Sequence, residues 1–485
     1  MFDRRDFIGC AAAAVTSSFV PTWAQASPRQ NEDIRLLEMI LKTLHPGIYR
    51  YASPAGLQAG LARLDQAWTK DPRLEARFLA LSQLLATLRC GHSYVNFFNQ
   101  KQAVAKQLFD RSDLFPLAFR WEKEGMVVLQ DQSLVPVIPR GSIVTAVNSV
   151  STATILARLL PLVRADGSNN GKRRALLSVT GGDEIETFDA FYPLMFASDG
   201  PGDYEIRYRA PGSTSESSVH LPGIDQSRRR SFQRSIGQDN DGPVWQWNMG
   251  TDGIAVLTMP GWALYNSKWN WQAWLDDRLD SLGGAKGLII DLRENEGGND
   301  CGQAILSRFA KRDIIVPSFE RLVRYRQVPK ALDGYLDTWD DSFRNWGDRV
   351  EPYDDRFLRL TDNEDNGVIV PHGKRVTVPM VILTSAQNSS STFQFANLTR
   401  LSGLGRLVGA MTGGNRRGIN GGAFFFARLP ESGLEFDVPL IGYFSRERQP
   451  DAGIAPDIAV RNTASDIAGD YDRTLNAGRA LILRS

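Results

Sequence analysis

Two apolar segments of strand length, at 287–292 and 378–384, constrain the fold of this chain more than any other feature. Neither segment alternates apolar with polar residues. Largely apolar runs of this length are typical of strands that are buried on both faces, as in a sheet covered by helices. The C-terminal part of the chain is therefore predicted to be an α/β domain.

Each of these segments runs directly into a turn whose residues suit acyl-transfer chemistry. The first turn ends in the pair Gly297-Gly298, and glycine amides can approach and stabilise an oxyanion because no Cβ blocks them. The second leads into Ser389-Ser390-Ser391 at the start of a predicted helix, where free amides and the helix dipole favour a nucleophile. Taken singly, a tight turn and a serine N-cap explain the two turns equally well.

A third polar segment, Arg89 to Tyr94, contains His92, one of four histidines in the chain. The segment follows a predicted helix, and Gly91 is explained there as the residue that stops this helix. A lone histidine is more often structural than catalytic, so this segment alone gives weak support for a site.

The first 26 residues have the three parts of an export signal. Paired arginines, Arg4-Arg5, precede Phe7-Ile8, an apolar stretch over 10–20 and an Ala24-x-Ala26 cleavage pattern. This arrangement resembles a bacterial twin-arginine signal. We expect a periplasmic or secreted protein.

The remaining sequence changes character several times. Helical periodicity over 33–88 predicts three helices, with Ser53-Pro54 and Asp71-Pro72 as the starts of the second and third. Short β-runs at 126–129 and 143–148, followed by a helix over 152–163, resemble a PDZ-type module, with another small β-rich domain as the alternative. The predicted units are a signal peptide (1–26), a helical region (27–112), a PDZ-like domain (113–224), a linker (225–244) and a catalytic domain (245–485) with an acidic, aromatic cap insertion (317–373).

Composition narrows the classes of function. Lys and Arg total 56 against 55 Asp and Glu, so no overall charge attracts nucleic acid or an anionic membrane. Beyond the N-terminus, no apolar run is long enough for a bilayer. Without H-x-x-x-H or C-x-x-C spacing, no structural zinc site is expected. Separately, nothing in the sequence implies a cofactor.

Together the segments resemble, in the same order, the C-terminal-processing and tricorn-type (tail-specific) serine peptidases. The resemblance implies a ClpP/crotonase-type α/β core with the nucleophile on a strand-to-helix turn, behind a helical bundle and a PDZ-like domain. The elements that carry it are Gly91-His92-Ser93, Asp291-Leu292-Arg293-x-Asn295-x-Gly297-Gly298, Ser390 before Phe395-Ala396, Gly409-x-x-Thr412-x-Gly414 and Gly453-Ile454-x-Pro456-Asp457-Ile458.

The resemblance assigns Ser390 as the nucleophile. It assigns the backbone amides of Gly297 or Gly298 and of Ser391 to the oxyanion hole. One branch of the family activates its serine with a lysine in a T-x-G-K pattern, but this chain has Asn415 at that position. The tricorn-type branch uses a histidine after glycine, and His92 is therefore the expected general base.

The assignment has open points. Ser93 is expected to support the histidine. The tricorn-type branch also uses an acidic residue in its catalytic relay, and here this is Asp451 or Glu447, with Asp451 preferred. Phe393 replaces a glutamate that is common in the family, and the flanking serines leave room for an error of one register.

Cys90 and Cys301 are the two cysteines that remain in the mature chain. If His92 and the glycine pair line one cleft, the two thiols can pair in a disulfide; two buried free thiols are the alternative.

The expected function is that of an exported serine peptidase that forms an acyl-enzyme on Ser390. Its partners are peptide or protein substrates, which the PDZ-like domain binds as an extended chain or through the C-terminus. The alternatives are a non-catalytic protein that binds hydrophobic ligands or peptides, and an esterase for small acyl substrates. The oligomeric state stays open.

Overall fold

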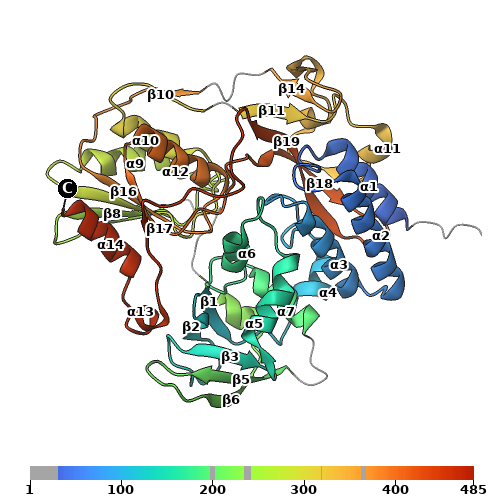
Figure 1. The fold of residues 1–485 in the computed structure, drawn as a ribbon, viewed down its shortest axis with the longest axis horizontal. Helices are drawn as coiled ribbons and strands as arrows, with labels where there is room; N and C mark the ends of the chain where they lie inside the picture. Colours follow the sequence, from blue (N-terminus) through green and yellow to red (C-terminus); the bar gives the residue numbers. More distant parts are fainter. Residues whose placement is uncertain (1–30, 197–201, 234–241, 318, 362–366, 485) are drawn as a thin grey trace, which may run out of the picture.

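The computed structural model describes residues 31–484 apart from 197–201, 234–241, 318 and 362–366, so the predicted export signal lies outside the described residues. Three six-stranded sheets, each with its own helices, make up the fold (Figure 1). None of the described helices is long and apolar enough to cross a membrane.

The N-terminal region contains the three expected helices, followed by a short fourth. Ser53 caps the second helix, with its side chain accepting a hydrogen bond from the Gly56 amide. The third helix starts after Arg73, not at Asp71-Pro72, and ends before Gly91, because Arg89 already has the left-handed φ of +53°. Gly91 is therefore not the helix stop that the sequence suggested. The helices are α1 (Glu32–Leu44), α2 (Pro54–Lys70), α3 (Leu74–Thr87) and α4 (Gln102–Phe109).

The middle domain is an antiparallel sheet in the order β1-β2-β3-β5-β6, with β4 beside β3. Both strands predicted from the sequence are present, and the predicted helix forms as α5 with a short 3₁₀ turn after it. The elements are β1 (Leu117–Glu122), β2 (Gly125–Asp131), β3 (Ile143–Val147), β4 (Val150–Ser151), α5 (Thr152–Leu159), α6 (Asn170–Leu176), α7 (Thr187–Met195), β5 (Asp203–Arg209) and β6 (Ser217–Pro222).

The described part of the expected linker packs onto this domain. Helix α8 (Gln226–Arg230) carries Arg229, whose buried guanidinium pairs with Asp189 of α7 at 2.8 Å. A buried charge needs a charged partner, so this arginine ties the segment down.

The predicted α/β domain is confirmed. Its sheet has the order β20-β17-β16-β9-β8-β7, and every neighbouring pair is parallel except β7 with β8. Alternate residues of β9 enter two different cores, Leu288 and Ile290 on one face and Ile289 on the other, which explains why the run is largely apolar. The strands are β7 (Gln246–Met249), β8 (Ile254–Thr258), β9 (Gly287–Asp291), β16 (Met380–Thr384), β17 (Arg406–Gly409) and β20 (Ile458–Ala459).

Helices cover both faces of this sheet (Figure 1). One face packs against α9, α10 and α12, and the other against α14, which places Ile482 among the strand residues. Near α14, the short α13 lies at the middle domain, where Arg140 donates a hydrogen bond to the Ile467 carbonyl at 2.8 Å. The helices are α9 (Trp271–Asp280), α10 (Cys301–Phe309), α12 (Ser390–Ser402), α13 (Ala464–Ala468) and α14 (Arg473–Ile482).

The insertion at 317–373 is not the separate cap that was expected. Its strands join β18 and β19 in a third sheet of order β12-β18-β19-β11-β14-β13. Aromatic residues of the insertion, such as Tyr325 and Trp346, are buried in the core that this sheet shares with the N-terminal helices, because the sheet offers them a large apolar face. The strands are β11 (Phe319–Val323), β12 (Leu336–Asp337), β13 (Val350–Pro352), β14 (Leu358–Leu360), β18 (Asn420–Arg428) and β19 (Glu435–Ser445); β10 (Ile314–Ile315) and β15 (Val368–Ile369) form a separate pair, and α11 spans Lys330–Asp333.

Candidate active site

Two buried asparagines hold the turns after β9 and β16 against each other. Asn388 donates from Nδ2 to the carbonyl of Asn295 at 3.0 Å, and its Oδ1 accepts from the Ser385 amide at 2.7 Å. Asn295 in turn accepts at Oδ1 from the Thr392 hydroxyl at 2.7 Å and from the Gly297 amide at 2.8 Å. The two turns are adjacent because β9 and β16 are parallel neighbours, whose carboxyl ends meet at one sheet edge.

Ser390 has the backbone geometry of a nucleophile on a sharp strand-to-helix turn. It opens α12 with a φ of +51°, a left-handed conformation that is strained for a residue with a Cβ. Its neighbours are less suitable: the Ser389 hydroxyl donates to the Glu296 carbonyl at 3.0 Å, and the Ser391 hydroxyl is buried. The half-buried Ser390 is the serine of this cluster that the geometry favours.

Gly297 lies directly against Ser390. A Cβ on Gly297 would stand 2.8 Å from the Cβ of Ser390, and Gly297 has a φ of +114°, so both space and conformation require glycine here. The Gly297 amide is engaged by Asn295. Of the amides that the sequence nominated for the oxyanion hole, those of Gly298 and Ser391 therefore remain for an incoming oxyanion.

His92 lies in the loop after α3, between the third sheet and the middle domain. Its ring packs 5.9 Å from the ring of Phe424 on β18. Asp166 fixes the loop by accepting a hydrogen bond from the Gly91 amide at 2.8 Å, and Arg164 donates to the Gly91 carbonyl at 2.9 Å. Gly91 is thus needed for this loop, since a Cβ there would stand 2.7 Å from an Asp166 carboxylate oxygen.

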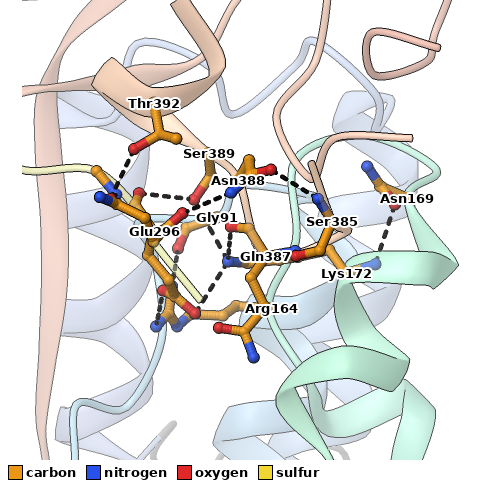
Figure 2. A network of polar contacts seen from close by, with 12 residues as sticks. Gly91, Arg164, Asn169, Lys172, Glu296, Ser385, Gln387, Asn388, Ser389 and Thr392 are labelled. Carbon is orange, nitrogen blue, oxygen red and sulfur yellow. Dashed lines mark hydrogen bonds and ion pairs between the residues drawn. The ribbon is translucent and has the colours of Figure 1, made fainter. Parts of the chain in front are cut away.

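A buried cluster of charges links the loop of Gly91 to the serine turn (Figure 2). Lys172 of α6 pairs with Glu296 at 3.0 Å and donates to the carbonyl of Gln387 at 2.7 Å and to the Ser389 hydroxyl at 3.3 Å. Arg164 pairs with the other oxygen of Glu296 at 3.3 Å. The middle domain therefore reaches into the turn that carries Ser390.

The pKa values in this cluster are shifted by burial and by neighbouring charges. Burial lowers the pKa of His92. The positive charges of Arg164 and Lys172 lower it further, whereas the negative charges of Asp166 and Glu296 raise it. For Glu296, burial alone would raise the pKa, but Lys172 and Arg164 bring it down to about 2. At neutral pH the centre therefore combines an ionised Glu296 with a neutral imidazole, the form of histidine that can accept a proton.

Ser93 and Asp451 form hydrogen bonds with residues other than His92. The Ser93 hydroxyl is hydrogen-bonded to Nε2 of the buried His45 at 2.9 Å, in contrast to the expected support of His92. Asp451 accepts from the Ser168 amide at 3.0 Å and from Asn415 Nδ2 at 2.7 Å, so it anchors the loop that carries Asp166. Glu447 is exposed.

The two cysteines are both buried and free, so the disulfide considered from the sequence is not formed. Cys90 belongs to the core of the N-terminal helices and accepts a hydrogen bond from Asn420 Nδ2 at 3.3 Å, whereas Cys301 opens α10 in the core of the parallel-sheet domain. The two thiols are therefore buried in different cores.

Lys172 and Arg164 are the site residues that sequence reasoning missed. Lys172 begins a Lys-Arg-Arg run, which reads as an ordinary solvated helix face, and no motif marks it. The described residues contain no group of three or more His, Cys, Asp or Glu placed to hold a metal ion.

Two cavities border the serine turn. One of about 800 Å³ lies between the middle domain and the parallel sheet and is lined by Gln387 and Asp451. A smaller one, of about 280 Å³, is lined by Gly297 and Glu296. Both offer space for a ligand beside the centre.

Comparisons with known proteins bear on the family and the fold of this chain. Residues 253–460 match the family model described as peptidase family S41. Two crystal structures of CPAF, one of a point mutant and one of the mature protein complexed with lactacystin, are 16% identical to this chain, cover 93% of it and 96% of their own chain, and superpose with TM-scores of 0.62 and 0.61. The photosystem II D1 C-terminal processing protease is 13% identical over 91% of this chain and 96% of its own, with a TM-score of 0.37. No curated protein sequence matches the chain.

The match to CPAF shows a shared fold along nearly the whole described chain. The chain carries a peptidase family S41 domain and is, by that domain, a serine-type peptidase, which acts on peptide or protein substrates.

Proposed function

We propose that this chain, as the bearer of an S41 domain, is an exported peptidase that uses Ser390 as nucleophile and His92 as general base. The observation that carries the proposal is the strained φ of Ser390 at the start of α12, against Gly297. A ClpP/crotonase-type core and a PDZ-type middle domain are part of the same proposal.

In the proposed reaction, the neutral imidazole of His92 takes the hydroxyl proton of Ser390 as Oγ attacks a peptide carbonyl. The developing oxyanion accepts hydrogen bonds from the amides of Gly298 and Ser391. The imidazolium then protonates the leaving amine, and a water molecule, deprotonated by His92, hydrolyses the acyl-enzyme. This sequence needs no cofactor.

The direct test is labelling of the purified protein with a fluorophosphonate probe, beside Ser390→Ala, Ser389→Ala and His92→Ala. We expect labelling to vanish in Ser390→Ala, to fall by about 10³-fold or more in His92→Ala, and to persist in Ser389→Ala. Labelling that survives Ser390→Ala and disappears in Ser389→Ala would move the nucleophile by one residue. A folded wild-type protein that takes no label would favour the binding-protein alternative.

Substrate recognition and export are tested separately. We propose that the middle domain binds the substrate C-terminus, so peptides with a free carboxylate should be cleaved faster than their amidated counterparts. Equal rates would contradict this part alone. For export, replacement of Arg4 and Arg5 by lysine should retain the protein in the cytoplasm if residues 1–26 act as a twin-arginine signal.

A further inference from the structure

We propose that Lys172 is a positioning residue of the active centre, through which the middle domain locks the serine turn onto the loop that carries Gly297. This inference rests on the proposed function and names a residue that no motif of the chain marks. It makes the middle domain a structural part of the catalytic centre in addition to any role in binding substrate.

The Lys172 side chain joins two loops that are distant in sequence. Its ammonium group contacts Gln387 and Ser389 on the serine turn and Glu296 on the turn after β9, at 2.7, 3.3 and 3.0 Å (Figure 2). Glu296 immediately precedes Gly297, which touches Ser390. A shift of the ammonium group would therefore move both sides of the oxyanion hole.

Burial lowers the pKa of Lys172 and Glu296 raises it, and all three N–H donors of the ammonium group are engaged. A lysine ammonium has three N–H donors, and Lys172 has three acceptors at hydrogen-bonding distance. The Lys172 side chain is buried, with 2% of it exposed. If the ammonium group lost a proton, the buried carboxylate of Glu296 would lose one of its two cationic partners, which is energetically costly. These contacts describe a fixed cation that orients its neighbours, while His92 moves the proton.

The backbone that presents Lys172 is itself tied to the parallel-sheet domain. Asn169 caps α6 by accepting from the Lys172 amide at 3.0 Å, and its Nδ2 donates to the carbonyl of Thr412 at 3.0 Å. The aliphatic stem passes Gly413, where a Cβ would stand 2.9 Å from Cδ of Lys172. The lysine thus enters the site along a packed path that leaves it little freedom.

The charge of Lys172 also acts on His92. Four charged residues influence the imidazole: Asp166 and Glu296 favour its protonated form, and Arg164 and Lys172 disfavour it. Loss of the lysine charge should therefore raise the pKa of His92, and loss of the Glu296 charge should lower it. A residue that only supports folding would not produce opposite shifts in these two variants.

The experiment measures the rate of fluorophosphonate labelling against pH for wild type, Lys172→Met, Glu296→Gln and Lys172→Arg. We expect Lys172→Met to label about 100-fold more slowly, because misplacement of catalytic groups by about 1 Å has this cost. Its acid limb should move up by about one pH unit, and that of Glu296→Gln should move down. Lys172→Arg keeps the charge, so its acid limb should stay at the wild-type position. The control is Arg174→Met, an exposed cation on the same helix, which should behave as wild type.

Three outcomes overturn the inference. One is wild-type labelling and an unmoved acid limb in a folded Lys172→Met variant. Another, which can be read even if Lys172→Met fails to fold, is an acid limb of Glu296→Gln that moves up or does not move. The third is an equal loss of labelling in Arg174→Met. Absence of labelling in the wild type would instead refute the proposed function.

Discussion

The two halves of the active centre are built in different ways. The serine half, formed by the turns after β9 and β16, is held from within by neutral amides of Asn295 and Asn388, and Lys172 adds charged contacts from the middle domain. The histidine half is held by charged or titratable groups, Asp166, Arg164 and His45, which come from elsewhere in the chain. Contacts between uncharged groups of neighbouring motifs can be recognised in a sequence and resist changes of pH. Contacts between ionisable groups that are distant in the sequence have neither property.

The largest effect is expected where the serine half is tightest. Gly297→Ala adds a Cβ at 2.8 Å from that of Ser390 and forces alanine to a φ of +114°, so the oxyanion loop must move. We expect kcat for peptide cleavage to fall by about 10²- to 10³-fold, the usual cost of an oxyanion-hole contact. Gly334→Ala is the matched control, because Gly334 has open space around it and a φ of −70°. Equal activities of the two variants would show that Gly297 has no part in the reaction.

The asparagine framework predicts a stability effect of the next size. Asn388→Ala leaves the carbonyl of Asn295 and the amide of Ser385 without their buried partner, which should lower the free energy of unfolding by about 2–4 kcal/mol. Urea unfolding measures this change. Asn476→Ala on α14, where the side chain bonds only the carbonyl one turn earlier, should cost far less. A loss in Asn388→Ala no greater than in Asn476→Ala would show that the serine half is not held by its amides.

Acid should weaken the histidine half first. Burial and the nearby Arg50 lower the pKa of His45 to about 3, while an unfolded histidine titrates near 6.5. Below about pH 6.5 the histidine is protonated in the unfolded state but stays neutral in the folded state. The free energy of unfolding should therefore fall by about 1.4 kcal/mol per pH unit between about pH 6.5 and pH 3. Between pH 7.5 and 5 the wild type should therefore lose about 2 kcal/mol more than His45→Gln. Parallel pH profiles of unfolding free energy in the two proteins would contradict this.

The smallest effect is expected at Asp451. Its substitution tests whether this residue is the acid of the catalytic relay or only holds a loop in place. Because its carboxylate bonds Ser168 and Asn415, Asp451→Asn should lower kcat/KM by about tenfold or less and leave the acid limb in place. A relay acid at this position would instead cost about 10⁴-fold, as in serine proteases that lose the aspartate of their triad. Glu447→Gln is the exposed control and should be silent.

The fold could be predicted from the sequence where side chains follow a strict local pattern. The apolar runs that became β9 and β16, the helix periodicity over α1 to α3 and the serine turn before α12 are all set by near neighbours. The insertion at 317–373 was misjudged because its aromatic residues gave no sign of their partner strands, β18 and β19, which lie some hundred residues later in the chain.

The sequence by itself determined that this chain has an α/β domain whose strands end in a glycine pair and a serine cluster. Strand burial, glycine conformation and helix capping depend on a few adjacent residues, so they can be read locally. Only the tertiary structure decided which distant groups complete the centre. In the folded protein Lys172 forms an ion pair with Glu296. Ser93 is hydrogen-bonded to His45, and Asp451 to Ser168. Cys90 and Cys301 lie in separate cores. An ion pair or a shared core depends on where domains meet, and that contact is fixed by the packing of whole surfaces rather than by any short motif.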